Sequence, residues 1–472
     1  MHRKDVLFVF ACMFAYALVV LAVPPYTPLI EPDSSGYLTF DSTRSAFYPA
    51  FLRICIALGL DLVQITWVQL AVFTVALGYL LATLLRNGFP KLLIGLFVAV
   101  LAVNVLFSSF HRSIMAESIY FSMSIVVIAL WIDYFRTGKV LLLGLAGLVL
   151  GLMIGIRPAG IGLVPLHALA AWLKWSKRSV SAVTLVATLV APVVLGIGGE
   201  RLLYRVVQGD TSKSLIPNLL LGKAAMLVRP NTIYTGPHAP ALNALGAQLN
   251  SIFEPAQQYL ADAPSLPVRT YLSAYYESQA HFGILSNELA EAAKREGVSA
   301  DSLRSKLGLQ AIFQNIAGYL KLALRNDLGQ WSVALGHFPP TARALARYAD
   351  ANPGISFGGR IGSEILHPAP TMVGLIAYPA FLAVGFCTLL LSAGVLVFLA
   401  RPSLADSPDG FHLLLAVFFS AMCHGYTLFI SLVNVWTPRF LMGVFPQLAI
   451  IALCLAVILL RHIKIAKTVQ PA

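Results

Sequence analysis

Residues 62–85 are LVQITWVQLAVFTVALGYLLATLL, a stretch without a single charged residue that ends directly before Arg86. It is longer than the ~20 apolar residues with which a helix crosses the hydrocarbon core of a bilayer. Similar runs recur along the chain, separated by short polar connectors. Hydrophobic residues make up 58% of the 472 residues and charged residues only 11%, compared with about 25% in a soluble domain. The sequence therefore predicts an all-α polytopic membrane protein.

About ten transmembrane helices are expected, with the first interpreted as a retained signal anchor. The predicted spans are 6–23, 62–85, 92–108, 117–135, 140–156, 158–173, 179–199, 373–400, 411–433 and 439–460. They define a transmembrane module of seven spans (1–199) and a C-terminal module of three spans (373–472). Between them, residues 200–372 are polar and show helical spacing at 286–295 and 310–325, with Ser299 as a candidate N-cap. This segment predicts a mostly helical extracytoplasmic domain.

The distribution of lysine and arginine predicts the orientation of the chain. One side holds thirteen basic residues, which are Arg3, Lys4, Arg86, Lys91, Arg136, Lys139, Lys174, Lys177, Arg178, Arg401, Arg461, Lys464 and Lys467. The short loops of the other side hold five, which are Arg44, Arg53, Arg112, Arg157 and Arg439. Cytoplasmic loops are enriched in basic residues, so both termini are predicted to be cytoplasmic. The absence of an Asn-x-Ser/Thr sequon favours a bacterial inner membrane, with the outer loops facing the periplasm.

The positions of the basic residues, cysteines and histidines argue against nucleic-acid binding and against a disulfide or metal site. The net charge of +12 comes largely from residues that flank apolar runs, which argues against nucleic acid as a partner and for membrane lipids. The five cysteines have no paired spacing, which predicts neither a disulfide framework nor a metal site. No His-x-x-x-His pattern, Gly-rich phosphate loop or Gly-x-Ser-x-Gly motif is present.

Four separated segments bring polar residues to the predicted outer face. They are the long first loop (24–61), with Asp33, Tyr37, Asp41 and Arg44; the connection before the fourth span, with His111, Arg112 and Glu117; the turn at Arg157; and the loop with Asn434 and Arg439. All five basic residues of these short loops are arginines, whose planar guanidinium binds phosphate or carboxylate through two parallel bonds. Snorkelling of each arginine to ordinary lipid headgroups is the alternative interpretation.

Carboxylates and helix ends supply the candidate chemistry of this face. A carboxylate such as Asp33, or alternatively Asp41, can take a proton from an acceptor hydroxyl, although Asp-Ser-Ser-Gly is also common in turns. Glu117 lies at the start of a predicted helix, where the helix dipole favours negative charge. Arg157 precedes Pro158 and Arg439 follows Pro438, and proline is favoured in the first turn of a helix. Each arginine is therefore expected at a fixed helix start, at the depth of a lipid phosphate.

The motifs together resemble the GT-C superfamily of integral-membrane glycosyltransferases, in particular the group of protein mannosyltransferases and aminoarabinose transferases. The resemblance rests on DSSGY (33–37) followed by Arg44, on SSFHRSIMAES (108–118), on IRP (156–158) and on TPRF (437–440). It implies that Asp33 is the catalytic base, that Glu117 supports the acceptor or a divalent metal, and that Arg157 and Arg439 contact the donor phosphate. Ser34 stands where the family has a second adjacent acid, so neither a metal nor another cofactor is firmly predicted.

The predicted function is transfer of a sugar from a polyprenyl-phosphate donor to a lipid, glycan or protein acceptor on the outer face, with inversion at the anomeric carbon. Asp33, Glu117 and Asp41 are the candidate catalytic residues. Tyr37, Arg44, His111, Arg112, Arg157, Asn434 and Arg439 are the candidate substrate-binding residues. Two alternatives remain: an O-antigen ligase or polymerase that uses a lipid-diphosphate donor, and a flippase or transporter of polyprenyl lipids, which would place polar residues deep inside spans.

Overall fold

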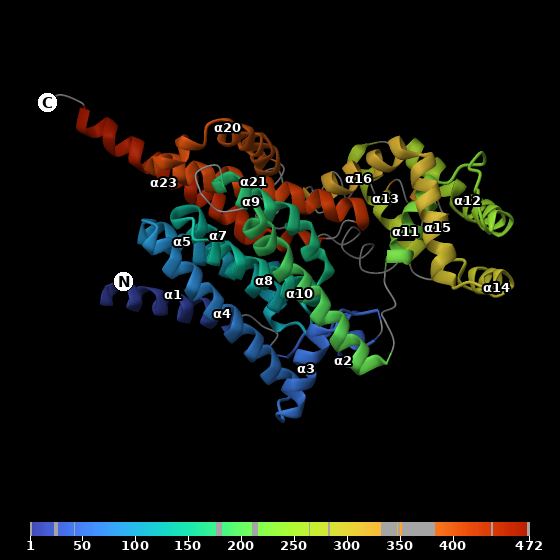
Figure 1. Ribbon diagram of the computed structural model, residues 1–472, viewed down its shortest axis with the longest axis horizontal. Helices are drawn as coiled ribbons and strands as arrows, with labels where there is room; N and C mark the ends of the chain where they lie inside the picture. Colours follow the sequence, from blue (N-terminus) through green and yellow to red (C-terminus); the bar gives the residue numbers. More distant parts are fainter. Residues whose placement is uncertain are drawn as a thin grey trace. The chain divides into compact units, whose positions relative to one another are not determined.

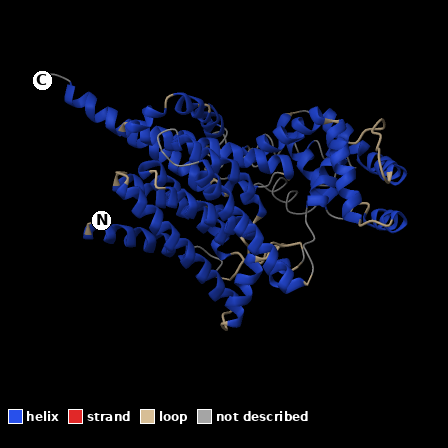
Figure 2. Ribbon diagram, in the orientation of Figure 1, coloured by secondary structure: helices blue, strands red, loops and turns tan. Residues whose placement is uncertain are grey.

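The protein is helical throughout the part of the chain that the structure, a computed structural model, describes (Figure 2). The described residues are 2–22, 27–41, 43–175, 182–209, 216–263, 265–281, 284–331, 347, 350–351, 383–435 and 438–469. Within these ranges the only β-type pairing is an isolated bridge between Leu29 and Ser113. The all-α prediction is confirmed.

Seven helices of the described residues are long and apolar enough to cross a membrane, which confirms a polytopic membrane protein. They are Arg3–Ala22, Leu62–Arg86, Glu117–Thr137, Val186–Gln208, Ala383–Ala400, Pro408–Val433 and Phe445–Ile463. Three predicted spans fall instead on shorter helices: α5 (Lys91–Val103), α8 (Val140–Ile156) and α9 (Val164–Trp175). The first part of predicted span 373–400 lies outside the described residues. A total of ten spans therefore remains a prediction.

The chain divides into two compact units, which are described separately (Figure 1). Unit 1 comprises residues 1–213, 388–426 and 442–472, and unit 2 comprises residues 214–387 and 427–441. The division differs from the predicted boundary at residue 200, because α10 (Ala182–Gln208) continues past it. The helix continues through the charged residues Glu200, Arg201 and Arg205.

In unit 1, α7 (Glu117–Thr137) is the most buried of the long apolar helices. It packs against α4 (Leu62–Arg86) and α8, and α8 packs in turn against α10. Gly151 of α8 and Gly196 of α10 permit a very close approach, since a Cβ on Gly196 would lie 2.2 Å from the carbonyl carbon of Gly151. Small residues allow membrane helices to pack this closely. The first residue of α7, Glu117, is accordingly buried, with a side chain that is 1% exposed.

Charged side chains of unit 1 gather at helix ends. Arg86 at the end of α4 pairs with Asp133 near the end of α7, at 2.8 Å. Lys91 at the start of α5 pairs with Asp5 near the start of α1 (Arg3–Ala22), also at 2.8 Å. Both pairs involve residues that the sequence assigns to the cytoplasmic side. Which end faces the cytoplasm remains a prediction.

Unit 2 is built from helices α11 (Ile216–Leu227), α12 (Ala239–Asp262), α13 (Leu266–His281), α14 (Ser286–Glu296), α15 (Ala300–Gln314) and α16 (Ile316–Trp331). Their apolar faces form one core that includes Leu221, Leu249 and Leu307. The predicted N-cap is confirmed, because the Ser299 hydroxyl accepts a hydrogen bond from the Ser302 amide at 3.1 Å. Unit 2 also contains the last residues of α21 (Pro408–Val433) and the start of α22 (Pro438–Met442).

Candidate functional site

The first long loop (24–61) is joined to the loop that precedes α7. The Leu29 amide donates to the Arg112 carbonyl at 2.8 Å, and the Ile114 amide donates to the Leu29 carbonyl at 3.1 Å. On the far side of the loop, Glu200 of α10 accepts a hydrogen bond from the Ala46 amide at 2.8 Å, and Tyr204 packs edge-on against Phe40. Two of the four predicted segments are therefore fixed to each other by main-chain bonds.

Asp33 is the N-cap residue of the short helix α2 (Ser34–Leu38), but its side chain makes no capping bond. Instead, the Asp33 carboxylate accepts a hydrogen bond from Nη2 of Arg44 at 2.9 Å. The turn before it is held by Ser34, whose hydroxyl accepts from the Glu31 amide while its own amide donates to the Glu31 carbonyl. Arg44 can lie this close to α2 only because residue 36 is glycine, since a Cβ there would be 2.8 Å from Nε of Arg44.

A second acid–arginine pair joins α7 to α8. Nη1 of Arg157, the residue that follows α8, lies 2.6 Å from Oε1 of Glu117, the first residue of α7. The Glu117 side chain is 1% exposed and that of Arg157 is 11% exposed. Each of these two buried charges stabilises the other, because a buried charge without a partner strongly destabilises the folded protein. Extended backbone at Arg157, followed by Pro158 and the 3₁₀ helix Pro158–Leu163, ends α8 at this point.

Tyr37 connects the two pairs. The guanidinium carbon of Arg44 lies 5.2 Å from the centre of its ring. Burial, together with the nearby Glu117 carboxylate, raises the pKa of Tyr37 to about 12, and Arg157, Arg44 and Asp33 also act on it. All four charged groups are therefore within electrostatic range of one phenol. We call Asp33, Tyr37, Arg44, Glu117 and Arg157 the acid–arginine cluster, and the structure brings these five predicted residues together.

Asp41 is engaged in its own turn. Its carboxylate accepts hydrogen bonds from the amide and the hydroxyl of Thr43, each at 2.7 Å. Aspartate commonly stabilises turns through bonds of this kind to residues two positions later. Both acids therefore have a partner within the loop, Thr43 for Asp41 and Arg44 for Asp33. Which of them acts as the base remains a prediction.

His111 is fully buried beside the cluster. One ring nitrogen pairs with the Tyr16 hydroxyl and the other with the Ser118 hydroxyl, each at 2.8 Å. Burial lowers the pKa of His111 to about 3, so the ring is neutral at physiological pH. With both nitrogens engaged, His111 supports the residue next to Glu117 rather than offering a group to a substrate. Arg112 is half-buried, and its carbonyl takes part in the loop pairing described above.

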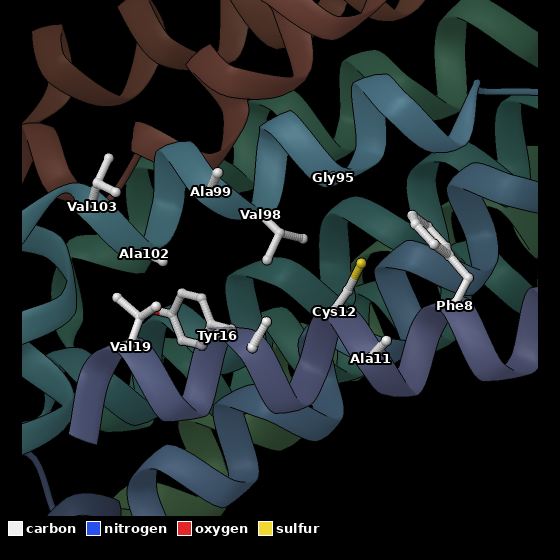
Figure 3. A pocket seen from close by; sticks show the side chains of 11 residues that line it. Phe8, Ala11, Cys12, Tyr16, Val19, Gly95, Val98, Ala99, Ala102 and Val103 are labelled. Atoms are coloured by element: carbon white, nitrogen blue, oxygen red, sulfur yellow. The ribbon is translucent and has the colours of Figure 1, made fainter. Parts of the chain in front are cut away.

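Tyr16 also lines an apolar groove of about 390 Å³ between α1 and α5 (Figure 3). The groove walls are aliphatic or aromatic side chains and small residues, among them Phe8, Cys12, Val98 and Ala102. The same tyrosine therefore contacts an apolar groove with its ring and His111 with its hydroxyl.

Asn434 and Arg439 belong to unit 2 and are described with it. The Asn434 side-chain oxygen accepts a hydrogen bond from the amide of Val435 at 2.8 Å, and its main-chain carbonyl accepts one from Lys223 at 3.0 Å. Arg439 is the second residue of α22, but its side chain lies outside the described residues. Their substrate-binding roles remain predictions.

No group of three or more His, Cys, Asp or Glu side chains that could hold a metal ion occurs among the described residues. Asp33 and Glu117 are each paired with an arginine, a cation that already neutralises the carboxylate.

Several supporting residues were not predicted from the sequence. Gly36 and Ser118 lie inside the motifs DSSGY and SSFHRSIMAES. The sequence did not indicate that Gly36 leaves room for Arg44 or that Ser118 forms a hydrogen bond with His111. Gln69 carried a usable signal, because it is an amide inside the long apolar run 62–85. Its side chain accepts from the Tyr48 hydroxyl at 2.7 Å and donates to the Ser113 carbonyl at 3.0 Å, so it ties α3 (Phe47–Ala57) to the second loop.

Comparison of the chain with protein-family models, with curated proteins and with solved structures gave no match.

Proposed function

We propose that the protein is a membrane glycosyltransferase that moves a sugar from a polyprenyl-phosphate donor to an acceptor hydroxyl on the outer face of the membrane. The observation that supports this most directly is the acid–arginine cluster. It combines an acid candidate for proton transfer, Asp33, with an arginine candidate for phosphate binding, Arg157, around one buried phenol.

The donor side of the proposal rests on Arg157 and on the apolar groove. Arg157 follows the last residue of α8, and an arginine at a helix end near the membrane surface is suited to an anionic lipid phosphate. The groove between α1 and α5 offers an apolar surface to a hydrocarbon chain. Tyr16 connects that groove through His111 and Ser118 to the start of α7, where Glu117 holds Arg157.

In the proposed reaction, Asp33 takes the proton of the acceptor hydroxyl as its oxygen forms a bond to the anomeric carbon. The bond between that carbon and the phosphate oxygen breaks, and polyprenyl phosphate leaves with the electron pair. Arg157 stabilises the charge that develops on the departing phosphate. A single displacement of this kind inverts the anomeric centre. Arg44 orients the Asp33 carboxylate and lies over the ring of Tyr37.

The test of the base compares Asp33→Asn with Asp41→Asn in purified protein supplied with a synthetic polyprenyl-phosphate sugar. Loss of a general base lowers turnover by about 10²–10⁴-fold, so Asp33→Asn is expected to be nearly inactive while still binding the donor. Asp41→Asn serves as the matched control, because the Asp41 carboxylate accepts hydrogen bonds from Thr43 in a local turn. An inactive Asp41→Asn beside a fully active Asp33→Asn would transfer the role to Asp41.

Arg157→Lys tests the donor contact. Lysine keeps the positive charge but lacks the planar fork, so turnover is expected to fall if the guanidinium binds phosphate through two bonds. Arg53→Lys in α3 is the control for an exposed arginine, whose guanidinium carbon lies 4.7 Å from the centre of the Phe40 ring. Equal, small effects of both substitutions would favour headgroup snorkelling. A clear preference for a diphosphate-linked donor would favour the ligase alternative.

A further inference from the structure

The C-terminal end of α21 is held by side chains from two helices of unit 2, α11 and α16. The last carbonyls of a helix have no partner within it and need other donors. Here Lys223 of α11 donates to the Ser431 carbonyl at 3.1 Å and to the Asn434 carbonyl at 3.0 Å. Tyr319 of α16 donates to the Leu432 carbonyl at 2.9 Å.

Lys223 is the centre of this arrangement. Its ammonium group has three N–H donors, and the third is directed at Oε1 of Glu277, 2.5 Å away on α13. The other Glu277 oxygen accepts from Asn326 of α16 at 2.9 Å. The Lys223 side chain is 1% exposed and that of Glu277 is 0% exposed. Every donor of this buried cation is therefore used, two of them on main-chain carbonyls at the end of α21.

Further bonds join the same stretch of α21 to α16. The Gln330 amide donates to the Thr427 carbonyl at 3.1 Å and to the Ser431 hydroxyl at 2.8 Å. The Trp331 indole donates to the Thr427 hydroxyl at 3.2 Å. These bonds surround the turn of α21 that leads to Asn434, so Lys223 acts at the last point before the chain leaves the helix.

We propose that Lys223 is a positioning residue for the segment that follows α21, and that it acts through the carbonyls of Ser431 and Asn434. This inference rests on the proposed function and on the sequence-based prediction that Asn434 and Arg439 bind the substrate. Arg439 follows Asn434 by five positions, so the place where α21 ends sets where that segment begins. A cation at a helix C-terminus also favours the negative end of the helix dipole. Lysine suits this position because its compact ammonium group meets three acceptors at once.

The test separates anchoring from folding by using two variants. Lys223→Met alone leaves Glu277 buried without its cation, and thermal stability is expected to drop sharply. Lys223→Met/Glu277→Gln removes both charges, and the glutamine oxygen still accepts from Asn326. The double variant is expected to recover most of the lost melting temperature. It still lacks the donors for Ser431 and Asn434.

Hydrogen exchange measures the anchoring directly and needs no substrate. In the double variant, amides of residues 431–435 should exchange roughly 10- to 100-fold faster than in the wild type, as expected for lost hydrogen bonds to a charged group. Amides of α12, which lies elsewhere in unit 2, should be unchanged. Leu249→Ala, a cavity in the core of unit 2, is the control for destabilisation without loss of the anchor. Unchanged exchange at residues 431–435 would overturn the inference.

Turnover then tests whether the position that Lys223 gives to the segment after α21 matters for catalysis. A misplacement of about 1 Å can lower the rate about 10²-fold, so the double variant should stay that far below wild type even with its stability restored. Leu249→Ala should keep near wild-type turnover below its melting temperature. Recovery of turnover together with stability would show a purely structural pair and overturn the positioning role. If the wild-type protein shows no turnover, the proposed function falls and the role of Lys223 in turnover falls with it, whatever the exchange rates are.

Discussion

Gly36→Ala should lower activity without lowering stability. A Cβ at residue 36 would lie 2.8 Å from Nε of Arg44, whereas ordinary van der Waals contacts begin at 3.4 Å, so Arg44 has to move by about 0.6 Å or more. The same movement would lengthen its 2.9 Å bond to Asp33 to about 3.5 Å, beyond the range of a good hydrogen bond. Alanine is otherwise well tolerated, because Gly36 lies in α2 and alanine favours a helix by up to about 1 kcal/mol over glycine.

The expected result is a melting temperature equal to or above that of wild type, with turnover lowered by about tenfold or more because the carboxylate of Asp33 loses its orientation. The assay is turnover of the purified variants with a synthetic polyprenyl-phosphate sugar, in parallel with thermal unfolding. Gly198→Ala in α10 is the matched control, because nothing lies within 4 Å of a Cβ there. Wild-type turnover by Gly36→Ala would refute the idea that the Asp33–Arg44 pair orients the base.

Three further results are expected. Glu117→Gln and Arg157→Met should each lower the free energy of unfolding by about 3–5 kcal/mol, because each leaves a buried charge or dipole without its partner. The double variant should lose less than the sum of the two. Strictly additive losses in a denaturation series would contradict the buried pair. Burial raises the pKa of Asp327 from 3.8 to about 6, so the folded state loses stability as pH rises from about 4 to 6. Asp327→Asn should therefore be more stable than wild type at pH 8, by on the order of 2–3 kcal/mol, but not at pH 4. Thermal unfolding at both pH values measures this difference. A reporter fused near Ala300 should be active only if it folds outside the cytoplasm; a cytoplasmic signal would reverse the predicted orientation.

The helical architecture was predictable because apolar runs and their charged flanks are local properties of the sequence. Helices such as α4 and α7 follow directly from them. The end of α10 was not predictable in this way, because its last part is charged and is held in place by Phe40 and Ala46 of a distant loop. Helices α5 and α9 show the same limit, since their ends differ from the predicted spans 92–108 and 158–173, whereas α8 has the predicted bounds 140–156.

The candidate site was partly predictable. Asp33, Glu117 and Arg157 could be chosen because carboxylates and arginines at the ends of apolar runs are unusual enough to notice. The pairing of Glu117 with Arg157 could not be derived, because these residues begin and end different helices 40 positions apart. The pairing of Asp33 with Arg44 depends on how their loop folds. Lys223 shows what sequence reasoning missed: a lone lysine in the apolar helix 216–227 is itself a signal, but its partners Glu277 and Asn434 come from far along the chain.

The proposed transfer is tested most directly by following one labelled donor in purified protein. A synthetic polyprenyl-phosphate sugar, labelled in the sugar, is incubated with the protein and a cell-envelope extract as the source of acceptor. We expect free polyprenyl phosphate to be released as the label moves to the acceptor with inverted anomeric configuration, and both events to be lost in Asp33→Asn. Transfer only from a diphosphate-linked donor, or no transfer at all by a folded wild-type protein, would contradict the proposed function.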